Sequence, residues 1–278
     1  MARARIFPRT VGQALTRTGG YLRGYTHSLQ PYVGCEFSCR YCYVREMTVQ
    51  RANPYRLPWS GWVSPKTNVA ARLLASAKRG TLASARIFMS SSTDPYVPLE
   101  RKLGLTRDLL EVMREFPAEA LVVQTRSPLV LRDIDLLSTL PNVGVSITIT
   151  TDDDRVRRAF EPDSPRVARR IEVLAALSAA GIPTQAAVSP ILPCDAAKLA
   201  ALLDPVADRV VVDDLARGDG AGGSRSRAAF AQLERLGHGH WTEPAAADEA
   251  FATLQRGLGN ERVVFSQPGF NELSGWLY

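Results

Sequence analysis

Three of the four cysteines in this 278-residue chain stand close together. They are Cys35, Cys39 and Cys42, spaced Cys-x3-Cys-x2-Cys, and we call them the loop cysteines. Such clustering is typical of metal binding rather than of disulfide cross-linking, and thiolates are the usual ligands of iron–sulfur clusters. Three ligands for four irons leave one iron open to a small molecule. The spacing therefore predicts a [4Fe–4S] cluster with one open iron.

Other interpretations of the loop cysteines remain open at this point. A structural zinc site needs a fourth ligand, for which Cys194 and His27 are the candidates. A redox dithiol needs only a Cys-x2-Cys pair and leaves Cys35 without a role. Buried, unligated thiols are a third interpretation, but they do not predict clustering.

Alternating strands and helices are expected to position this loop. Apolar and β-branched runs predict strands over 27–33, 86–92, 120–125, 143–150, 183–192 and 209–213. Capping residues and amphipathic stretches predict helices over 68–78, 106–116, 129–140, 164–180, 195–203, 227–236 and 246–258, with Asn68, Thr106 and Ser164 as N-caps. About six β/α units imply a parallel sheet with right-handed crossovers, closed either as an open doubly wound sheet or as a full or partial barrel. In both, chemistry lies at the carboxyl ends of the strands, where the loop cysteines follow the first strand.

Composition sets limits on the class of protein. Hydrophobic residues make up 45% of the chain and charged residues 22%, which is globular composition. No apolar run approaches 18 residues, so no membrane span is expected. The first residues lack the apolar stretch of a secretory signal, so a cytoplasmic location is expected.

The amino-terminal arm, residues 1–24, is basic. The first 34 residues contain no acid, and the net charge of the chain is +6. The arginines of the arm are Arg3, Arg5, Arg9, Arg17 and Arg23. Such an arm could contact nucleic-acid phosphates, and a solvated or barrel-covering extension is the simpler interpretation.

The motif Cys-x3-Cys-x-aromatic-Cys, with Tyr41 as the aromatic residue, resembles the signature of the radical S-adenosylmethionine (SAM) superfamily. In that family the open iron binds the methionine part of SAM, and one electron from the cluster cleaves the sulfonium bond. The resulting 5′-deoxyadenosyl radical abstracts hydrogen from a substrate, while the protein binds and orients the reactants. The resemblance implies a reduced electron donor of flavodoxin or ferredoxin type.

Longer segments are similar to the spore photoproduct lyase-like branch of that superfamily. They are SSSTDPYVPLERKLGLTRDLLE (90–111), QTRSPLVLRDIDLL (124–137), VSITITTDDDRVRRAFEP (145–162) and GIPTQAAVSPILP (181–193). The resemblance implies a partial (β/α)6 barrel over 25–215, with the arm before it and carboxyl-terminal helices and a tail over 216–278 packed on the barrel.

The resemblance also implies contacts to the methionine part of SAM. Ser92 and Thr93 correspond to hydroxyl contacts of the amino group, and Asp94 is placed to orient them. Arg126 stands where the branch usually has lysine, and a cation there can pair with the carboxylate of SAM. Arginine can do so through two hydrogen bonds, but its reach and geometry differ from those of lysine.

Further residues correspond to other parts of the site. Ser146 matches a serine near the ribose, and Tyr41 matches the residue that approaches the adenine. Ser91 stands where photoproduct lyases have a cysteine hydrogen donor, which argues against assuming photoproduct repair. Cys194, just past the fifth strand, is a candidate thiol hydrogen donor or a structural thiol.

The sequence thus predicts a radical SAM enzyme, lyase-like or repair-like, whose substrate is unidentified and for which a nucleic acid is one candidate. The alternative is a non-catalytic zinc protein that binds nucleic acid through the basic arm. The glycine-rich stretch over 218–227 is expected to be a flexible loop at the barrel mouth rather than a dinucleotide site.

Overall fold

The structure, a computed structural model, describes residues 4–274, 276 and 277, so that Arg3 of the basic arm lies outside the described residues. Its main sheet has the strand order β11-β10-β9-β8-β7-β6-β3-β2. Neighbouring strands from β3 to β11 are parallel, and β2 pairs with β3 antiparallel. The strands are β2 (Leu15–Arg17), β3 (His27–Leu29), β6 (Arg86–Met89), β7 (Ala120–Thr125), β8 (Val143–Thr148), β9 (Thr184–Val188), β10 (Arg209–Val212) and β11 (Val263–Phe265). This parallel α/β arrangement confirms the predicted barrel-type fold.

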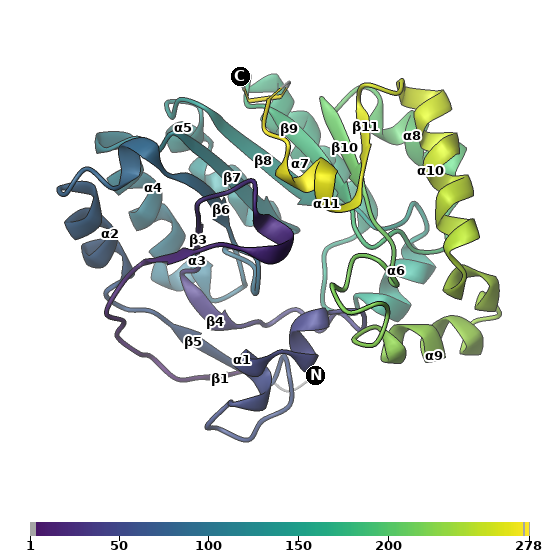
Figure 1. Cartoon of the computed structure of the whole chain (residues 1–278), viewed down its shortest axis with the longest axis horizontal. Coiled ribbons are helices and arrows are strands. Elements are labelled where there is room, and N and C mark those ends of the chain that lie inside the picture. Colours follow the sequence, from purple (N-terminus) through teal and green to yellow (C-terminus); the bar gives the residue numbers. More distant parts are fainter. Residues whose placement is uncertain (1–3, 275, 278) are drawn as a thin grey trace.

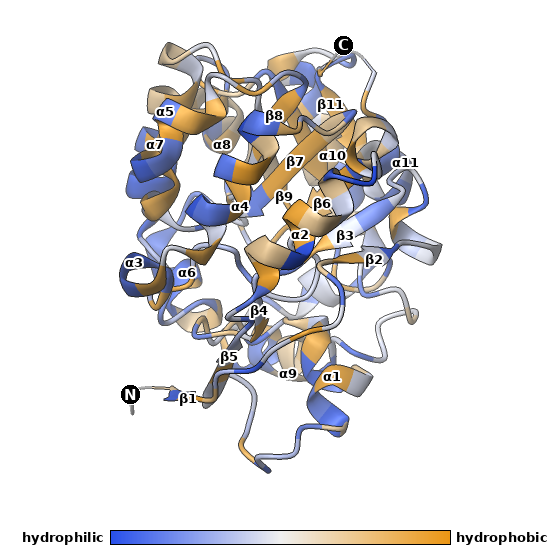
Figure 2. Cartoon of the chain, turned by 90° about the vertical axis from the view of Figure 1, so that its left-hand side faces the viewer, coloured by the Kyte–Doolittle hydropathy of each residue, from blue (hydrophilic) through white to orange (hydrophobic). Residues whose placement is uncertain are grey.

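Helices cover one face of the main sheet (Figure 1). The helices are α1 (Thr48–Arg51), α2 (Val69–Ala77), α3 (Glu100–Leu103), α4 (Leu105–Glu115), α5 (Ile134–Leu137), α6 (Asp154–Phe160), α7 (Val167–Ala179), α8 (Ala196–Leu203), α9 (Arg227–Arg235), α10 (Pro244–Leu258) and α11 (Ser266–Asn271). Alternate strand residues such as Val123, Val145 and Ile147 lie in the largest buried core, together with residues of α2, α4, α5, α7, α8 and α10, which cover this face. Figure 2 shows the same division, with mostly hydrophobic central strands behind helices of mixed hydropathy.

The opposite face of the sheet is closed near its amino end by the carboxyl-terminal tail. Phe88 and Val122 pack there with Leu273 and Leu277 in a separate apolar cluster. Gly144 makes room for this tail, because a Cβ atom at this position would lie 2.5 Å from the Trp276 ring. The tail therefore fills the barrel where the sheet offers apolar side chains.

The amino-terminal arm and the carboxyl-terminal segment meet across the open side of the barrel, where the 3₁₀ turn Gly20–Leu22 contacts α11 (Figure 1). The backbone N–H of Gly24 donates to Asn271 Oδ1 at 2.6 Å, and Asn271 Nδ2 donates to the Tyr21 carbonyl at 2.6 Å. The Tyr21 hydroxyl donates to the Asp213 carboxylate at the end of β10. The arm thus covers the barrel, and the terminal 216–278 segment supplies a strand, β11, as well as helices.

A small second sheet carries the segment that leads into the loop cysteines. Its order is β1-β5-β4, formed by β1 (Arg5–Ile6), β5 (Trp62–Pro65) and β4 (Tyr32–Gly34). The single strand predicted over 27–33 is therefore wrong, since β3 belongs to the main sheet and β4 to the small one. Pro31 stands between them and has no N–H to donate to a sheet.

Several predicted helix boundaries are also corrected. The helix predicted from Ser164 begins at Val167, with Arg166 as its N-cap, and α4 follows Gly104, so Thr106 lies inside the helix. The Thr106 hydroxyl instead donates to the Pro95 carbonyl. The helix predicted over 129–140 is a 3₁₀ helix, Pro128–Asp133, continued by α5. Helix α6, which the sequence did not predict, follows β8 and leads to a buried glutamate, Glu161.

Candidate functional site

The loop cysteines lie directly after β4. Cys35 and Cys39 are buried and Cys42 is half-buried, and no disulfide joins them. Burial raises the pKa of Cys35, and negative charge on Asp94, Cys39 or Cys42 would raise it further. Burial also raises the pKa of Cys39 to about 11, with Arg126 opposing the rise. The protein alone therefore favours neutral thiols here, and a bound metal would have to stabilise the thiolates.

Backbone contacts fix the shape of this loop. Gly34 has a φ of +78°, and a Cβ atom there would lie 2.6 Å from the Trp62 carbonyl oxygen. Only glycine combines this left-handed conformation with so close an approach. At the other end, Arg45 Nε donates to the Cys39 carbonyl at 3.0 Å and Nη2 donates to the Ser38 carbonyl at 3.3 Å. Arg45 thus holds the loop through its backbone, and Cys35 and Cys39 within it are buried.

The polar residues after β6 lie beside this loop. The Thr93 hydroxyl donates to the Gly34 carbonyl at 2.5 Å, immediately before Cys35. Ser92 is half-buried, and its hydroxyl has no hydrogen-bond partner among the described residues. Asp94 is buried and accepts hydrogen bonds from the Thr125 hydroxyl at 2.6 Å and the Arg126 N–H at 3.0 Å. Asp94 therefore ties the end of β6 to the end of β7.

Arg126 brings a positive charge against the loop cysteines. Its Nη1 donates to Cys39 Sγ at 3.0 Å and to the Tyr41 hydroxyl at 2.8 Å. The same nitrogen lies 3.2 Å from Glu161 Oε1, and the side chain is 15% exposed. The predicted SAM carboxylate ligand thus sits at the loop, with Nε and Nη2 lacking a hydrogen-bond partner within the described part of the chain.

Glu161, a residue that sequence reasoning missed, organises the back of this site. It is fully buried and forms an ion pair with Arg170, accepts a hydrogen bond from Tyr41, and accepts one from the Thr150 hydroxyl at 3.0 Å. Burial would raise the pKa of Glu161, but Arg170 and Arg126 outweigh burial and lower it to about 2. The carboxylate therefore stays charged and fixes Tyr41 and Arg126.

On the inner face of the barrel, the side chains beyond those that contact the carboxyl-terminal tail are polar. Ser146 is fully buried and its hydroxyl accepts a hydrogen bond from Gln185 Nε2 at 2.9 Å, while Gln124 Nε2 donates to the Thr148 hydroxyl at 2.8 Å. Three buried oxygens on this face lack a partner in the described residues: Gln30 Oε1, Ser90 Oγ and Gln124 Oε1. Unpaired buried acceptors are costly, so a polar ligand or water at this face would satisfy them.

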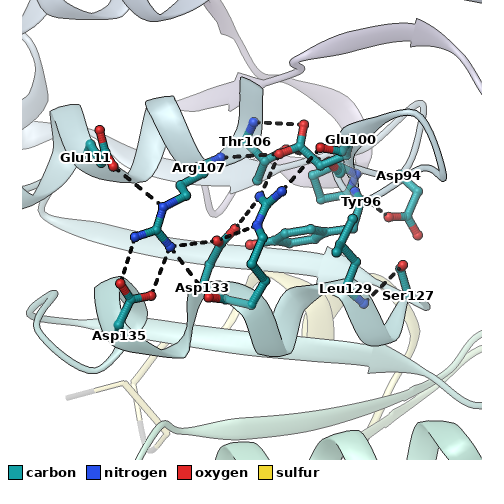
Figure 3. Close-up of polar contacts among 12 residues, drawn as sticks. Asp94, Tyr96, Glu100, Thr106, Arg107, Glu111, Ser127, Leu129, Asp133 and Asp135 are labelled. Carbon is teal, nitrogen blue, oxygen red and sulfur yellow. Dashed lines mark hydrogen bonds and ion pairs between the residues drawn. The ribbon is translucent and has the colours of Figure 1, made fainter. Parts of the chain in front are cut away.

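An ion network around the buried carboxylates of Glu100 and Asp133 supports the ends of β6 and β7 from behind (Figure 3). Glu100 accepts a hydrogen bond from Arg132 at 2.7 Å, and Arg132 also pairs with Asp133 at 2.8 Å. Arg107 pairs with Asp133 at 3.0 Å and with Asp135 at 2.7 Å. Figure 3 shows these side chains bridging the segment that follows β6, which carries Asp94, and the segment that follows β7, which carries Ser127. The network thus holds these two segments in place.

The remaining candidates lie elsewhere. Cys194 packs against the helix-side core, and burial together with Asp152 and Asp195 raises its pKa to about 12. A hydrogen-donor role for Cys194 stays a prediction. The glycine-rich loop is ordered around Asp219, whose carboxylate accepts from the backbone N–H groups of Ala221, Gly223 and Arg225.

The donor set at the loop suits an iron–sulfur cluster chemically. Among the described residues, no group of three or more His, Cys, Asp or Glu side chains is arranged to hold a single metal ion. A cuboidal cluster binds each thiolate at a different iron, so its ligands need not converge on one point. Three neighbouring free thiols beside a buried cation fit such a cluster.

Comparison with known proteins assigns the class. The radical SAM superfamily domain matches residues 29–193, which is more than half of the chain. This protein therefore belongs to the radical SAM superfamily, as its cysteine motif predicted, a superfamily that uses SAM and an iron–sulfur cluster. The non-catalytic zinc-protein alternative is not favoured by this membership.

Two relatives of this chain are described as uncharacterised proteins. The chain is 33% identical over 171 residues to protein MJ0683 of Methanocaldococcus jannaschii, covering 61% of this chain and 62% of the relative. It is 26% identical over 172 residues to protein Rv2578c of Mycobacterium tuberculosis, covering 61% of this chain and 50% of the relative. The chain thus spans between half and two thirds of the length of these proteins.

Solved structures resemble this fold at low sequence identity. Spore photoproduct lyase complexed with a dinucleoside spore photoproduct superposes with a TM-score of 0.65 and 12% identity, over 94% of this chain and 81% of the lyase. SuiB of Streptococcus suis, bound to the precursor peptide SuiA, gives a TM-score of 0.51 and 16% identity, over 90% of this chain and 54% of SuiB. The fold is that of the predicted branch. No helix of the described chain has the length and apolar character that crossing a membrane requires.

Proposed function

We propose that the loop cysteines hold a [4Fe–4S] cluster and that the protein cleaves SAM reductively to start radical chemistry on a substrate carbon. The observation that carries this proposal is the set of three free thiols, at positions 35, 39 and 42, directly after β4 and inside the superfamily domain. When bound, the cluster supplies the electron that breaks the sulfonium bond. The chain's own residues bind, orient and shield the reactants.

The SAM contacts are proposed at the residues that surround the loop. Ser92 and Thr93 would receive the methionine amino group, and the free nitrogens of Arg126 would pair with the carboxylate. The half-buried, unpartnered hydroxyl of Ser92 supports this placement. Asp94 would act indirectly, since its hydrogen bonds hold the Arg126 backbone and Thr125 in the described chain.

The nucleoside part of SAM is proposed to lie along the polar inner face. Ser146 would lie near the ribose and Tyr41 near the adenine, beside the unpartnered oxygen of Gln124. The Tyr41 hydroxyl is engaged by Glu161 and Arg126, so its backbone and ring are the parts available to a ligand.

The substrate class, the electron donor and the cytoplasmic location remain predictions. A lyase-like or repair-like reaction on a nucleic acid is one candidate, and the complexes of the two similar folds hold a dinucleoside photoproduct and a peptide. Exposed arginines of the arm, Arg5, Arg9, Arg17 and Arg23, support a polyanionic substrate. A reduced flavodoxin or ferredoxin is proposed as the electron donor.

One experiment tests the central proposal. The protein is reconstituted anaerobically with iron and sulfide, reduced with dithionite and mixed with SAM, and 5′-deoxyadenosine is measured by mass spectrometry. We expect four irons per chain and formation of 5′-deoxyadenosine, and neither in a variant whose loop cysteines are all serine. A fully loaded cluster that forms no 5′-deoxyadenosine would refute the SAM-cleaving function.

A further inference from the structure

We propose that Arg126 donates a hydrogen bond to the Cys39 thiolate and thereby makes the iron–sulfur cluster easier to reduce. The inference rests on the proposed function, because it requires that the loop cysteines hold a cluster. It assigns to Arg126 a role that is separate from binding SAM, namely that of positioning a positive charge at one cluster ligand.

The geometry places the guanidinium on the sulfur itself. Arg126 Nη1 lies 3.0 Å from Cys39 Sγ, within hydrogen-bond distance of a sulfur acceptor. The guanidinium also lies over the rings of Phe37 and Tyr41, at 6.0 and 5.9 Å from their centroids. The ring contacts and the low exposure of the side chain keep water from this contact.

Other residues hold Arg126 in this position. Its backbone N–H donates to Asp94 at 3.0 Å, which fixes where the side chain leaves β7. Its Nη1 lies 3.2 Å from the Glu161 carboxylate, and Glu161 is in turn held by Arg170. These contacts form within the protein itself. The positive charge of Arg126 is therefore in place before a ligand binds.

A charge in this place affects electron transfer in a known direction. One-electron reduction adds negative charge to the cluster and its sulfurs. A neighbouring cation and an N–H donor to a ligand sulfur stabilise the reduced form more than the oxidised form. Loss of the Arg126 charge is therefore expected to make reduction about tenfold less favourable, which for one electron corresponds to about 59 mV.

The two roles of Arg126 use different nitrogens. Nη1 faces Cys39, Tyr41 and Glu161, whereas Nε and Nη2 have no hydrogen-bond partner within the described residues. A SAM carboxylate could therefore bind the free edge without displacing the contact to sulfur. Measuring the cluster in the absence of SAM isolates the role proposed here.

The experiment compares midpoint potentials of the reconstituted cluster without SAM, by redox titration followed by electron paramagnetic resonance. The variants are Arg126→Gln, which removes the charge, and Arg126→Lys, which keeps it. Arg45→Gln is the matched control, because Arg45 holds the same loop through the carbonyls of Ser38 and Cys39 and not through a sulfur. Dissociation constants for SAM are measured in parallel.

We expect the midpoint potential to fall by about 59 mV in Arg126→Gln. In Arg126→Lys and in Arg45→Gln we expect a fall of less than half of that shift. A loaded Arg126→Gln cluster with the wild-type potential would overturn the inference, even if SAM binding were weakened. A wild-type protein that binds no four-iron cluster would instead refute the proposed function.

A second measurement keeps the inference testable if Arg126→Gln does not load iron. Wild-type protein labelled with 15N-arginine is reduced and studied by electron–nuclear double resonance. A 15N coupling to the cluster that persists in Arg45→Gln is the expected result. Absence of any 15N coupling in the wild-type protein would overturn the hydrogen bond to Cys39.

Discussion

Replacing Glu161 by glutamine should destabilise the fold through the ion cluster behind the cysteine loop. The pKa of this carboxyl falls from 4.5 to about 2 despite full burial, because Arg170 and Arg126 favour its charged form. That fall corresponds to about 3 kcal/mol of folding free energy. Breaking a buried ion pair by removing one partner costs about 3–5 kcal/mol, which is similar to the free energy that follows from the fall in pKa. We therefore expect Glu161→Gln to lower the free energy of unfolding by about 3 kcal/mol.

Urea unfolding of the metal-free protein, followed by circular dichroism, measures this loss. With a denaturant slope of about 3 kcal/mol per molar, the midpoint should fall by about 1 M. Glu172→Gln is the control, since the Arg169–Glu172 pair has the same charges but side chains that are 51% and 61% exposed. An exposed pair of this kind contributes about 0.2–1 kcal/mol at most.

The pH dependence gives the prediction a second, independent check. The folded-state pKa of Glu161 lies below the unfolded value, so its stabilisation is complete above about pH 4.5 and is lost as the pH falls toward 2. The difference between wild type and Glu161→Gln should be constant from pH 6 to 8 and shrink below pH 4.5. If Glu161→Gln behaved like Glu172→Gln at neutral pH, the reasoning about the buried cluster would be refuted.

Three further predictions concern other parts of the chain. Changing any loop cysteine to serine should abolish the brown colour and bound iron of the reconstituted protein, whereas Cys194→Ala should keep both; iron retained after a loop substitution would remove that thiol from the ligand set. Burial raises the pKa of Asp213 to about 6, above its unfolded 3.8, so the charged form opposes folding above about pH 6. Asp213→Asn should therefore raise the free energy of unfolding by about 1–3 kcal/mol at pH 8 and change it little below pH 4, and an equal effect at both pH values would contradict this origin. Gly144→Ala should lower the thermal midpoint because its Cβ would overlap the Trp276 ring, while Gly12→Ala, with no atom within 4 Å, should leave it unchanged; equal midpoints would contradict the packing of the tail.

Local signals allowed much of the barrel to be predicted from the sequence. The runs that form β7 and β10 are continuous and apolar because both of their faces are buried, and they were placed to within a residue. Strand β11 lies between α10 and α11 and has three residues, which is too short for a periodic pattern. The split at Pro31 was missed because both halves, β3 and β4, are extended and differ only in their partners.

The site likewise contains residues that can be recognised from a short stretch of sequence and residues that only the folded chain brings together. The loop cysteines are recognisable because three ligands lie within one loop, and their spacing is itself the signal. Glu161 could not be found by spacing, since its bond to Tyr41 joins residues 120 positions apart. A fully charged glutamate after a helix also looks like a solvated residue in sequence, and of the arginines that keep it charged, Arg126 directly follows β7 and Arg170 lies in α7. A signal did exist in retrospect, because Arg170 falls on the apolar face of α7.

The buried charges at this site are not explained by stability. Taking Arg126, Glu161 and Arg170 out of water is costly, and apolar side chains of similar volume often serve a folded core as well or better. Apolar side chains could not, however, place an N–H group 3.0 Å from Cys39 or keep Tyr41 oriented by a carboxylate. The ion cluster therefore makes sense as the means by which α7 and the residue that follows α6 hold a cation against one thiol. Under the proposed function, the ease with which a cluster at this loop is reduced would depend on Glu161 and Arg170, which hold Arg126 from behind.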